Sequence, residues 1–591
     1  LKRCSRNPRS ISQRPLALEA LEMNVPTMIT RTHPWRRDAT MALTWATLAF
    51  VCLGIPLHSL ADQRPNIVLI VLDDAGYSDL GVFGGEIRTP NIDRLADGGV
   101  QFTQFHVTPN CSSTRASLLT GMDHHRTGLG THAVTAKNQQ GKPGYEGYLN
   151  ERVITLPEVL QSAGYRTMMA GKWHLGSKDT ATWPSARGFD DSFSLLNGGA
   201  SHWQDNNPLL PSKPSRYVKN GELLRTLPHG FYSSDYYTDQ ILESIGNTEQ
   251  PFFAYLSFTA PHNPLHAPAE SFQRYEQTFL EGWDAMQLRR LERLKSLGLV
   301  PKDVRPQPRP DWIPPWESLS ETEKQLAARD MAIYAGMIDR LDQNVGRLVA
   351  RLKAQQKYGN TLIMVMSDNG PSKTTTADYV ELDGRGQDFL KQFNNTLENR
   401  GLSGSNVDLG PGWAYGLAAP FRLMKGYQSQ GGVLSPLIVK QPIGWQTDDQ
   451  ESLVTVPVHV MDLMPTMLEA ARTKHPTEES PSLALSMQGM CLRTLMQGGD
   501  PTPFEQRGFG GELFGMRSYR RGRWKAIKLP PPYGTDKWQL YDLSRDPGET
   551  IDVSANHPGE LDRLVVLWAN YAKTNGVVEP DEPVAYAKPP K

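Results

Sequence analysis

Cysteine is scarce in this sequence, with four residues in a chain of 591. Cys4 and Cys52 lie in an N-terminal stretch unlike the rest of the chain, which leaves Cys111 and Cys491 for the folded part. Two cysteines exclude the disulfide framework typical of small secreted proteins. Cys111 lies among polar residues, and a cysteine in such a place is a candidate for chemistry.

A surplus of charge is absent as well, since 62 basic residues stand against 63 acidic ones. No overall electrostatic field therefore attracts nucleic acid or an anionic membrane, and neither is expected as a partner. Affinity for an anion must come from a local cluster of cations. The hydrophobic share of 39% and the aromatic share of 9% are ordinary for a globular protein and exclude wholesale disorder.

The apolar run near the N-terminus, Met41 to Leu57, is short for a helix that spans a membrane. Leu1 is not an initiator, and the possible starts are Met23, Met28 and Met41. From Met28 onward basic residues precede the apolar run, and Ser59-Leu60-Ala61 follows it with the small-x-small pattern of a signal peptidase site. This order predicts a secretory signal, with an N-terminal membrane anchor as the alternative.

Four continuous apolar runs predict strands that are buried on both faces of a sheet. They span residues 66–72, 166–170, 252–258 and 361–366, and each is followed by polar residues. Helical patterns lie between them, the clearest being an apolar stripe from Met331 to Leu352 at spacings of three and four. The alternation predicts an α/β fold with a large, mainly parallel β-sheet sandwiched by helices. In such sheets ligands bind beyond the carboxyl ends of the strands.

The last hundred or so residues have a different pattern. Residues 508–543 show short alternating strands with Gly turns, which predicts an antiparallel sheet, and a helix is expected from about His557 to Thr574. The Pro- and Ser-containing stretch from Thr473 to Pro481 predicts a boundary. We therefore expect an upstream tail with the signal in residues 1–61, a catalytic domain in 62–475 and a smaller C-terminal α+β subdomain in 476–591.

The residues that follow two of the apolar runs form a set of oxygen ligands, namely Asp73, Asp74, Asp368 and Asn369. Hard divalent cations prefer oxygen ligands, whereas zinc favours His or Cys. The neutral amide oxygen of Asn369 suits calcium in particular. An isolated Asp-Asp pair is more often a turn or a helix cap, but the whole set at adjacent strand ends favours a metal site.

Cys111 opens the segment C-S-S-T-R, which reads as the start of a helix that stops at Gly121. A residue at this position faces unpaired backbone N–H groups and the positive end of the helix dipole, where anions are favoured. Arg115, one turn on, can face the same place. A buried structural role is the common fate of a free cysteine, but the polar neighbours of Cys111 argue against it.

Cationic residues and histidines follow the other strands. Lys172 and His174 alternate beyond the run at 166–170, so that both can point into one crevice, although a lone Lys-x-His is more often a solvated loop. His262 lies between two prolines, which fix the direction of its loop. Lys425 is a possible anion contact, but the residues alone favour an ordinary structural role.

The sequence resembles a known family at several motifs. They are R-P-N-I-V-L-I-V-L-D-D, C-S-S-T-R-A-S-L-L-T-G, G-K-W-H-L-G, F-T-A-P-H, M-S-D-N-G and F-R-L-M-K. In this order they resemble the type I sulfatases of the alkaline phosphatase superfamily, whose sheet is mixed. G-K-P-G-Y-E-G-Y-L-N-E-R-V, G-F-Y-S-S-D and W-Q-L-Y-D-L-S-R-D-P-G-E resemble the bacterial arylsulfatases in particular. The resemblance runs from about Arg64 to about Glu579.

The resemblance implies an enzyme that hydrolyses aryl or alkyl sulfate esters. The bacterial arylsulfatases that it resembles need no export, whereas the predicted signal places this chain in the bacterial periplasm or outside the cell. The resemblance implies that a maturation enzyme oxidises Cys111 to formylglycine, whose hydrate attacks sulfur and is then regenerated as sulfate leaves. One calcium ion per chain would be held by Asp73, Asp74, Asp368 and Asn369. A small sulfate ester is the expected substrate, and no stable membrane association is expected after signal cleavage.

The resemblance also implies a role for each remaining candidate. Arg115 would orient the formylglycine, Lys172 and Lys425 would neutralise the sulfate oxygens, and these cations would stabilise the transferring charge. His174 would assist breakdown of the covalent intermediate. His262 would protonate the leaving alcohol.

The family motif usually has proline where this chain has Ser113. An inactive sulfate-binding relative with an unconverted Cys111 is therefore one alternative, and a phosphonate monoester or phosphodiester hydrolase of the same superfamily is another. The loop from Ser372 to Gly412, with Trp413 and Tyr415 at its end, is a candidate wall of the specificity pocket. The region of His202 and Trp203 is a second candidate.

Overall fold

The computed structural model describes residues 64–132, 135–378, 388–447, 451–584 and 586. Asp62–Lys591 forms one compact unit by its internal contacts. The predicted signal lies in residues 1–61, outside the described part of the chain. No helix in the ranges given above combines the length and the apolar character needed to cross a membrane.

A large sheet forms the centre of the described chain. Its strand order is β10-β2-β9-β8-β1-β7-β3-β4-β5-β6, and β11 pairs with β2. The strands are β1 (Asn66–Leu72), β2 (Val100–His106), β3 (Arg166–Lys172), β4 (Asp191–Leu195), β5 (Tyr217–Lys219), β6 (Glu222–Leu223), β7 (Phe252–Ser257), β8 (Thr361–Ser367), β9 (Leu434–Lys440), β10 (Leu453–Val454) and β11 (Val458–His459). β8, β1, β7, β3 and β4 run parallel, whereas β9 runs antiparallel to both β8 and β2. The prediction of a mixed, mainly parallel sheet is confirmed.

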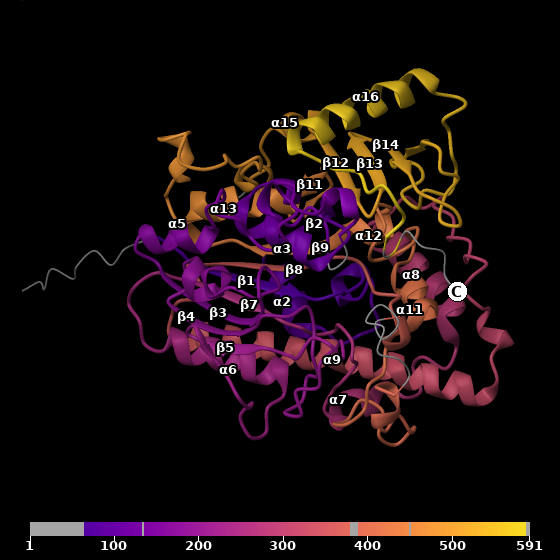
Figure 1. Ribbon diagram of the computed structural model, residues 1–591, viewed down its shortest axis with the longest axis horizontal. Helices are drawn as coiled ribbons and strands as arrows, with labels where there is room; N and C mark the ends of the chain where they lie inside the picture. The colour runs from indigo at the N-terminus through magenta and orange to yellow at the C-terminus, as the bar shows by residue number, and fades with distance from the viewer. Residues whose placement is uncertain (1–63, 133–134, 379–387, 448–450, 585, 587–591) are drawn as a thin grey trace, which may run out of the picture. The chain divides into compact units, whose positions relative to one another are not determined.

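The side chains of β1 alternate between two hydrophobic cores, one on each face of the sheet. Val68 and Ile70 belong to the core that includes α6 (Ser233–Ile245), α8 (Gly282–Ser296) and α9 (Glu321–Ala354). Ile67 and Leu69 belong to the core that includes α3 (Cys111–Thr120), α5 (Leu156–Ser162) and α13 (Leu463–Ala470). Figure 1 shows α3, α5 and α13 above the strands and α6 and α9 below them. A strand buried on both faces is therefore apolar at every position, as the sequence of β1 predicts.

The other helices are shorter. They are α2 (Pro90–Asp97), α4 (His124–Thr127), α7 (Ala269–Phe272), α11 (Gly410–Leu417), α12 (Gln430–Val433), α14 (Arg493–Met496) and α15 (Thr502–Gln506). The long helix α9 begins with a capping box, in which Ser320 accepts a hydrogen bond from the backbone N–H of Glu323 and the Glu323 side chain accepts one from Ser320. Its apolar stripe, predicted from Met331 to Leu352, is buried.

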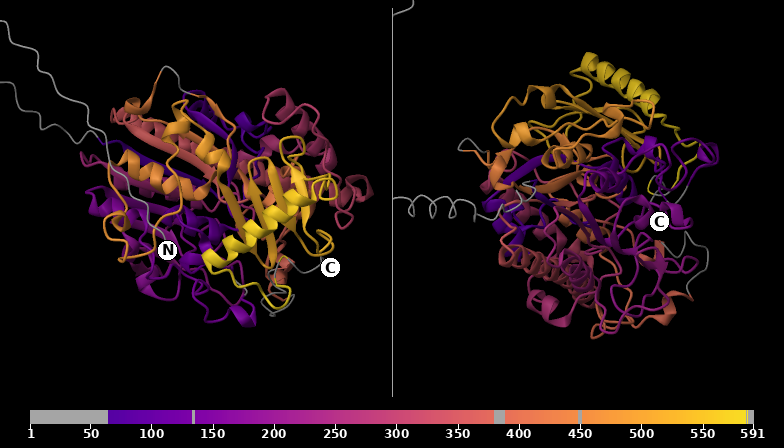
Figure 2. Two further views of the ribbon diagram at one scale, coloured as in Figure 1. Left: turned by 90° about the horizontal axis from the view of Figure 1, so that it is seen from above. Right: turned by 90° about the vertical axis from the view of Figure 1, so that its left-hand side faces the viewer.

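A second, antiparallel sheet lies in the C-terminal part, in the order β12-β13-β14-β15. Its strands are β12 (Gly508–Leu513), β13 (Met516–Arg521), β14 (Trp524–Lys528) and β15 (Gln539–Asp542). Helix α16 (Pro558–Asn575) covers one face of this sheet and buries Leu564 and Trp568 (Figure 2). The antiparallel sheet and the helix predicted from the sequence are both present.

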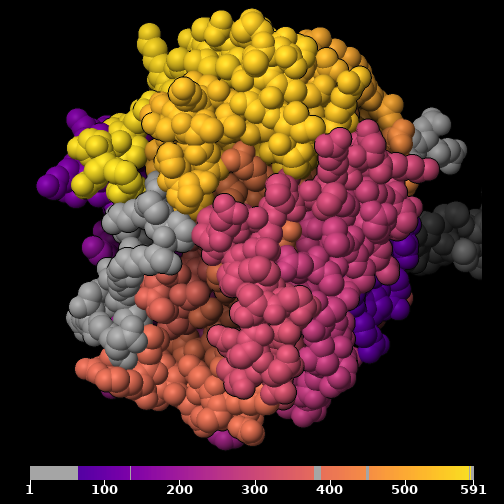
Figure 3. Space-filling view, turned by 90° about the vertical axis from the view of Figure 1, so that its right-hand side faces the viewer, coloured from indigo at the N-terminus to yellow at the C-terminus, as the bar shows by residue number. Residues whose placement is uncertain are grey.

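Buried polar contacts attach the small sheet to the rest of the unit. The Glu512 carboxylate of β12 lies 3.1 Å from Nε2 of His125 in α4, and the Tyr571 hydroxyl of α16 donates to Asp123 at 2.7 Å. Nζ of Lys525 in β14 donates to Oε1 of Gln430 in α12 at 3.2 Å. Figure 3 shows the C-terminal residues (yellow) in direct contact with the segment around residue 300 (pink).

Leu341 in α9 is fully buried, whereas Leu288 in α8 is half exposed. We expect Leu341→Ala to lower the free energy of unfolding by about 2–5 kcal/mol, because the lost methyl groups leave a cavity in the core. Leu288→Ala is the matched control and should change it by about 0.5 kcal/mol or less. Urea denaturation followed by fluorescence measures both, and equal effects of the two substitutions would contradict the assignment of α9 to the core.

Candidate active site

The acidic residues that follow β1 and β8 meet because these two strands are parallel neighbours. Leu72 pairs with Ser367 at the last position of the shared register. The backbone N–H of Asp74 donates to Oδ1 of Asp368 at 3.2 Å across the strand ends. Asp74 has φ of 70°, a left-handed conformation that is rare for a residue with a side chain. Such a conformation at a strand end marks a place where the fold constrains the chain for function.

Two lysines reach this acidic group from distant parts of the chain. Nζ of Lys172, the last residue of β3, donates to Oδ2 of Asp73 at 2.6 Å. Nζ of Lys425 donates to both carboxylate oxygens of Asp74, at 2.7 and 2.8 Å. All four side chains are buried. Buried charges of this kind must be paired, because each charge alone would have a large desolvation cost.

Arg115 pairs with the third carboxylate. Its Nε and Nη2 lie 2.8 and 2.6 Å from Oδ2 of Asp368, and its Nη1 donates to the carbonyl oxygen of Lys172 at 3.2 Å and to the hydroxyl of Ser257. The guanidinium is fully buried. It therefore joins the end of β8 to the ends of β3 and β7.

Two oxygens in this cluster lack hydrogen-bond partners in the described structure, although both are buried. They are Oδ1 of Asp73 and Oδ1 of Asn369. The amide nitrogen of Asn369 donates to Asp74 at 2.6 Å and to the carbonyl oxygen of Gly370 at 2.9 Å. Ligand atoms of Asp73, Asp74 and His262 lie within 4.8 Å of one another, as do those of Asp73, Cys111 and Asp368. Buried oxygens without partners beside carboxylates fit a hard divalent cation.

The two neighbouring carboxyl groups differ in acidity. Burial raises the pKa of Asp73 to about 8, and Lys172 offsets this effect only in part. Burial also acts to raise the pKa of Asp74, but Lys425 and His262 outweigh it and hold that pKa below its usual range. A bound cation would favour the charged form of both groups.

Cys111 is the first residue of α3 and is 2% exposed. Its Sγ lies 3.4 Å from Nδ1 of His174 and 3.5 Å from Oδ1 of Asn110. Burial raises the pKa of the thiol, and Lys172 and Lys425 offset the rise only in part. The side chain at this position is therefore held as a neutral thiol among cations.

Each of the two predicted histidines has a defined partner. Nδ1 of His262 lies 2.6 Å from the carbonyl oxygen of Asn263, so that Nε2 faces Asp74 at 3.6 Å. Burial lowers the pKa of His262, although Asp74 acts to raise it. Burial and then Lys172 lower the pKa of His174. Both rings are held as neutral imidazoles in this environment.

Contacts between these groups link all ten predicted site residues into one cluster, in which all but the partly exposed His174 are buried. They are Asp73, Asp74, Cys111, Arg115, Lys172, His174, His262, Asp368, Asn369 and Lys425. Trp173, between Lys172 and His174, is buried in the core and donates from Nε1 to the carbonyl oxygen of Thr182.

Sequence reasoning missed two features of the site. The ring of His132 stands at 90° to that of His174, with 4.8 Å between centroids, and its Nδ1 lies 2.8 Å from the Ser112 hydroxyl. A Cβ on Gly198 would lie 2.7 Å from the His174 ring, and one on Gly199 would lie 3.3 Å from the His262 ring. The available signal was the Gly-Gly pair after an apolar stretch, because glycine permits close approach of the backbone.

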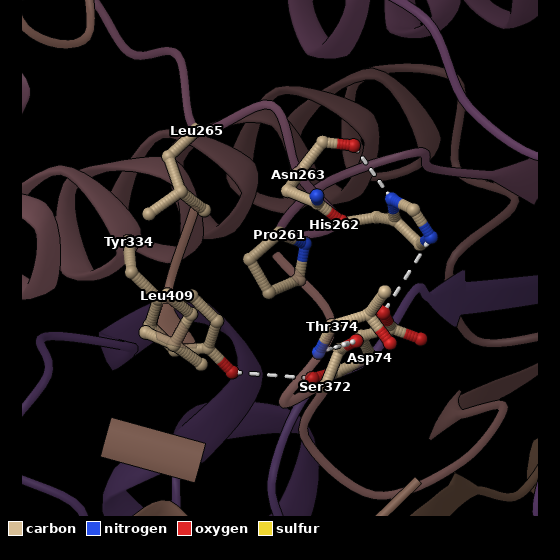
Figure 4. Close-up of a pocket in the computed structure, with 9 residues that line it drawn as sticks. All are labelled: Asp74, Pro261, His262, Asn263, Leu265, Tyr334, Ser372, Thr374 and Leu409. Atoms are coloured by element: carbon tan, nitrogen blue, oxygen red, sulfur yellow. Dashed lines mark hydrogen bonds and ion pairs between the residues drawn. The ribbon is translucent and has the colours of Figure 1, made fainter. Parts of the chain in front are cut away.

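A pocket lies beside Asp74 and His262 (Figure 4). It is lined by Asp74, Pro261, His262, Asn263, Leu265, Tyr334, Ser372, Thr374 and Leu409. The loop that begins at Ser372 therefore contributes to it. Trp413 does not, because it packs on Trp283 and Trp316 in the core, so the hypothesis that Trp413 lines a specificity pocket is wrong. Tyr415 is buried as well and donates to the carbonyl oxygen of Gln307.

His202 contacts the backbone of His262 and not the pocket itself. Nε2 of His202 lies 3.0 Å from the carbonyl oxygen of His262, and its Nδ1 lies 2.7 Å from the hydroxyl of Ser233. Trp203 is partly buried and packs on Tyr232. His202 thus fixes the loop that carries His262 and does not itself line the pocket.

Comparison with known proteins identifies the family. The family model described as Sulfatase matches residues 65–473. An uncharacterized sulfatase of Schizosaccharomyces pombe is 41% identical over 540 residues, which are 88% of this chain and 96% of that protein. The arylsulfatase of Klebsiella aerogenes is 37% identical over 419 residues, which are 70% of this chain and 88% of that protein.

Solved structures show the same fold. Ps i-CgsB in complex with k-i-k-neocarrahexaose matches with a TM-score of 0.60 at 23% identity, and the match covers 88% of this chain and 94% of that one. Sulfatases of the alkaline phosphatase-like fold are among the structural neighbours, and this fold agrees with the prediction from the sequence. The chain therefore belongs to the sulfatase family and is a sulfuric ester hydrolase, an enzyme that releases sulfate from sulfate esters.

Proposed function

We propose that this protein hydrolyses aryl or alkyl sulfate monoesters with a formylglycine made from Cys111 and one calcium ion. The buried oxygens of Asp73 and Asn369 that lack hydrogen-bond partners carry this proposal, together with the position of Cys111 within 4.8 Å of ligand atoms of Asp73 and Asp368. The 37% identity to the arylsulfatase of Klebsiella aerogenes supports the aryl and alkyl class.

The ligands of the calcium ion would be Asp73, Asp74, Asp368 and Asn369. When bound, the ion would neutralise the carboxylates and polarise the sulfate group. Lys172 and Lys425 pair with two of these carboxylates. With that negative charge neutralised, both lysines would be able to donate to the sulfate oxygens. The N-terminus of α3 adds backbone N–H groups to the same anion site.

The proposed reaction needs a nucleophile at position 111 and side chains that transfer protons to and from the reacting groups. A buried thiol with a raised pKa is a poor nucleophile, which favours the oxidised form of Cys111 over the thiol itself. His174, whose Nδ1 lies 3.4 Å from Sγ, is placed to take a proton from the group at position 111. His262 presents Nε2 toward Asp74. Because the neutral ring carries its proton on Nδ1, which bonds the carbonyl oxygen of Asn263, the ring would have to take up a second proton at Nε2 before it could protonate the leaving alcohol. Arg115 would hold the group at position 111 in place through Asp368.

The timing of the conversion follows from burial. Cys111 is 2% exposed and Ser113 is fully buried in the first turn of α3, where its hydroxyl donates to the carbonyl oxygen of Leu129. A maturation enzyme cannot reach either residue in the folded chain. We infer that it acts on the unfolded segment, before folding.

We also infer that the protein is exported with a cleaved signal, because basic residues, the apolar run and Ser59-Leu60-Ala61 occur in the order of a secretory signal. In a bacterial host the mature protein should be recovered from the periplasm or the medium, and sequencing its N-terminus should give Asp62 as the first residue. Recovery of the uncleaved chain from the membrane fraction would favour the alternative of an anchor.

Mass spectrometry of the peptide that carries Cys111 tests the nucleophile. Protein made in a host with a formylglycine-generating enzyme should contain the aldehyde at position 111, and its activity toward 4-nitrophenyl sulfate should rise with the converted fraction. Cys111→Ala should lower kcat by about a thousand-fold or more, because the covalent route is lost. Cys491→Ala, which changes the other cysteine of the described chain, is the control and should retain activity. If active preparations contain only the thiol, the proposed nucleophile is wrong.

Removal of one proposed ligand tests the metal site. Asp368→Ala should abolish the binding of calcium in isothermal titration calorimetry and lower turnover by about a thousand-fold or more, since both the ligand and the partner of Arg115 are lost. Asp500→Ala removes an exposed carboxylate and is the control. A normal calcium content in the Asp368 variant would contradict the assignment, whatever its activity.

A further inference from the structure

The chain that follows α16 packs against the catalytic part of the molecule. The backbone N–H of Val578 donates to the hydroxyl oxygen of Tyr145 at 2.8 Å. Farther along, Val584 is buried in the core that includes α9, and Tyr586 is partly buried against the same core. The C-terminal segment, defined as residues 577–584 and Tyr586, is therefore a folded part of the unit.

The ring of Tyr586 lies against the residue that follows Lys425. A Cβ on Gly426 would overlap with Cγ of that ring, so the ring fills the space that a side chain at position 426 would need. Gly426 has φ of 91°, a conformation that favours glycine. Burial raises the pKa of the Tyr586 hydroxyl, and the charge of Lys425 acts to lower it. The C-terminal segment thus reaches the neighbourhood of a cation of the site.

Two backbone hydrogen bonds also hold the chain at Lys425. Its N–H donates to the carbonyl oxygen of Pro371 at 3.1 Å, and the N–H of Gly426 donates to that of Pro109 at 2.7 Å. Pro109 lies two residues before Cys111, and Pro371 follows the proposed metal ligands at the end of β8. The backbone at Lys425 is therefore attached to the segments that carry the nucleophile and the ligands, and the Tyr586 ring completes its packing.

Neighbouring side chains fix Tyr586 in this place. Its ring stacks on that of Phe514, in the turn between β12 and β13, with 5.5 Å between centroids and 30° between planes. Its hydroxyl group lies 2.8 Å from that of Thr374, which lines the pocket beside Asp74. Nζ of Lys373 lies 5.5 Å from the centroid of the ring, within range of a cation–π contact. The ring is therefore held both by the small sheet and by the loop that lines the pocket.

An ordinary packing role is common for an aromatic residue at the edge of a core, and Tyr519 of β13 provides an example. Tyr519 is partly buried and packs on the small core that Leu564 of α16 shares with β14 and β15. Both tyrosines belong to the C-terminal part. Tyr586 differs from Tyr519 by its contacts with Gly426 and Thr374, next to the reaction site.

We propose that Tyr586 is a positioning residue for the reaction, whose ring holds the backbone at Lys425 so that the ammonium group meets the sulfate. Without the ring, the space beside Gly426 is empty and the chain can shift into it. A displacement of about 1 Å can cost about a hundred-fold in rate even when it originates far from the reacting atoms. The inference rests on the proposed function, because it assumes that Lys425 binds sulfate. It makes the C-terminal segment, outside the residues 65–473 that match the family model, necessary for full activity.

A double-mutant cycle between Tyr586 and Lys425 tests this role, with 4-nitrophenyl sulfate as the substrate of the converted, calcium-loaded enzyme. Tyr586→Ala should lower kcat/KM about 10-fold to 100-fold, because Lys425 is no longer held in place. Lys425→Met, which removes the charge, should lower it about a hundred-fold or more. In the Lys425→Met background, Tyr586→Ala should lower it further by about threefold at most, since residues that act as a unit are not additive.

Two further variants separate the ring from its hydroxyl group and from packing in general. Tyr586→Phe keeps the ring against Gly426 and loses only the hydrogen bond to Thr374, so it should lower kcat/KM by about threefold at most. Tyr519→Ala removes a ring from the C-terminal part without touching the site and is the matched control. It should change kcat/KM by less than about twofold, whatever its effect on the midpoint of thermal unfolding. If Tyr586→Ala does not fold, Tyr586→Leu, which keeps apolar bulk, replaces it in the cycle.

Three results would overturn the inference. Tyr586→Ala could leave kcat/KM unchanged, its effect could multiply in full with that of Lys425→Met, or Tyr586→Phe could lose as much activity as Tyr586→Ala. In each case a strong effect of Lys425→Met alone shows that the proposed function still stands. If Lys425→Met has no effect on an active enzyme, the proposed role of Lys425 fails together with the inference. If the converted wild-type enzyme does not hydrolyse 4-nitrophenyl sulfate, the proposed function fails, and the inference fails with it.

Discussion

The burial of three carboxylates at the ends of β1 and β8 constrains the rest of the site. Asp73, Asp74 and Asp368 are at most 1% exposed, and carboxylates so deep in a protein must be matched by cations. The matching cations come from β3, from α3 and from the segment before α12, so these segments must come together with the ends of β1 and β8 before all of the charges are paired. Folding of the sheet and formation of the site are in this sense one event.

The same constraint explains the chemistry at Cys111. The cations that compensate the carboxylates also surround the N-terminus of α3, where anions are favoured. A sulfate group entering this place meets positive charge that the fold already needs for its own stability. The thiol gains little from that charge because burial keeps it neutral, which agrees with a residue that has to be oxidised before it can act.

The C-terminal sheet contacts the chain that follows α3. The carboxylate of Asp123, at the start of α4, lies 2.8 Å from Nδ1 of His125. The carboxylate of Glu512 in β12 lies 3.1 Å from Nε2 of the same ring. Burial acts to lower the pKa of His125, but the two carboxylates outweigh it and raise that pKa to about 9. The imidazolium is therefore charged at neutral pH and ties the end of α3 to the small sheet.

The sequence by itself determined the strands β1, β3, β7 and β8, the helix α3 and the oxygen-rich residues at the strand ends. It could do so because apolar runs buried on both faces and helix starts are local patterns, and parallel strands bring their ends together. The motifs added the family, which the comparisons confirm. For Lys425, the residues around it favoured an ordinary role, and only the motif marked it for the site.

The tertiary structure alone decided which residues complete the site and which do not. Trp413 was expected at the pocket, but it is the neighbour of Trp283 and Trp316 in the core, because an aromatic residue in a loop shows no periodicity that separates core from pocket. The unpaired amide oxygen of Asn369 and the close approach of Gly198 to His174 depend on segments far apart in the sequence. Whether a polar side chain is satisfied is a property of its neighbours in space, and no local pattern in a single sequence records them.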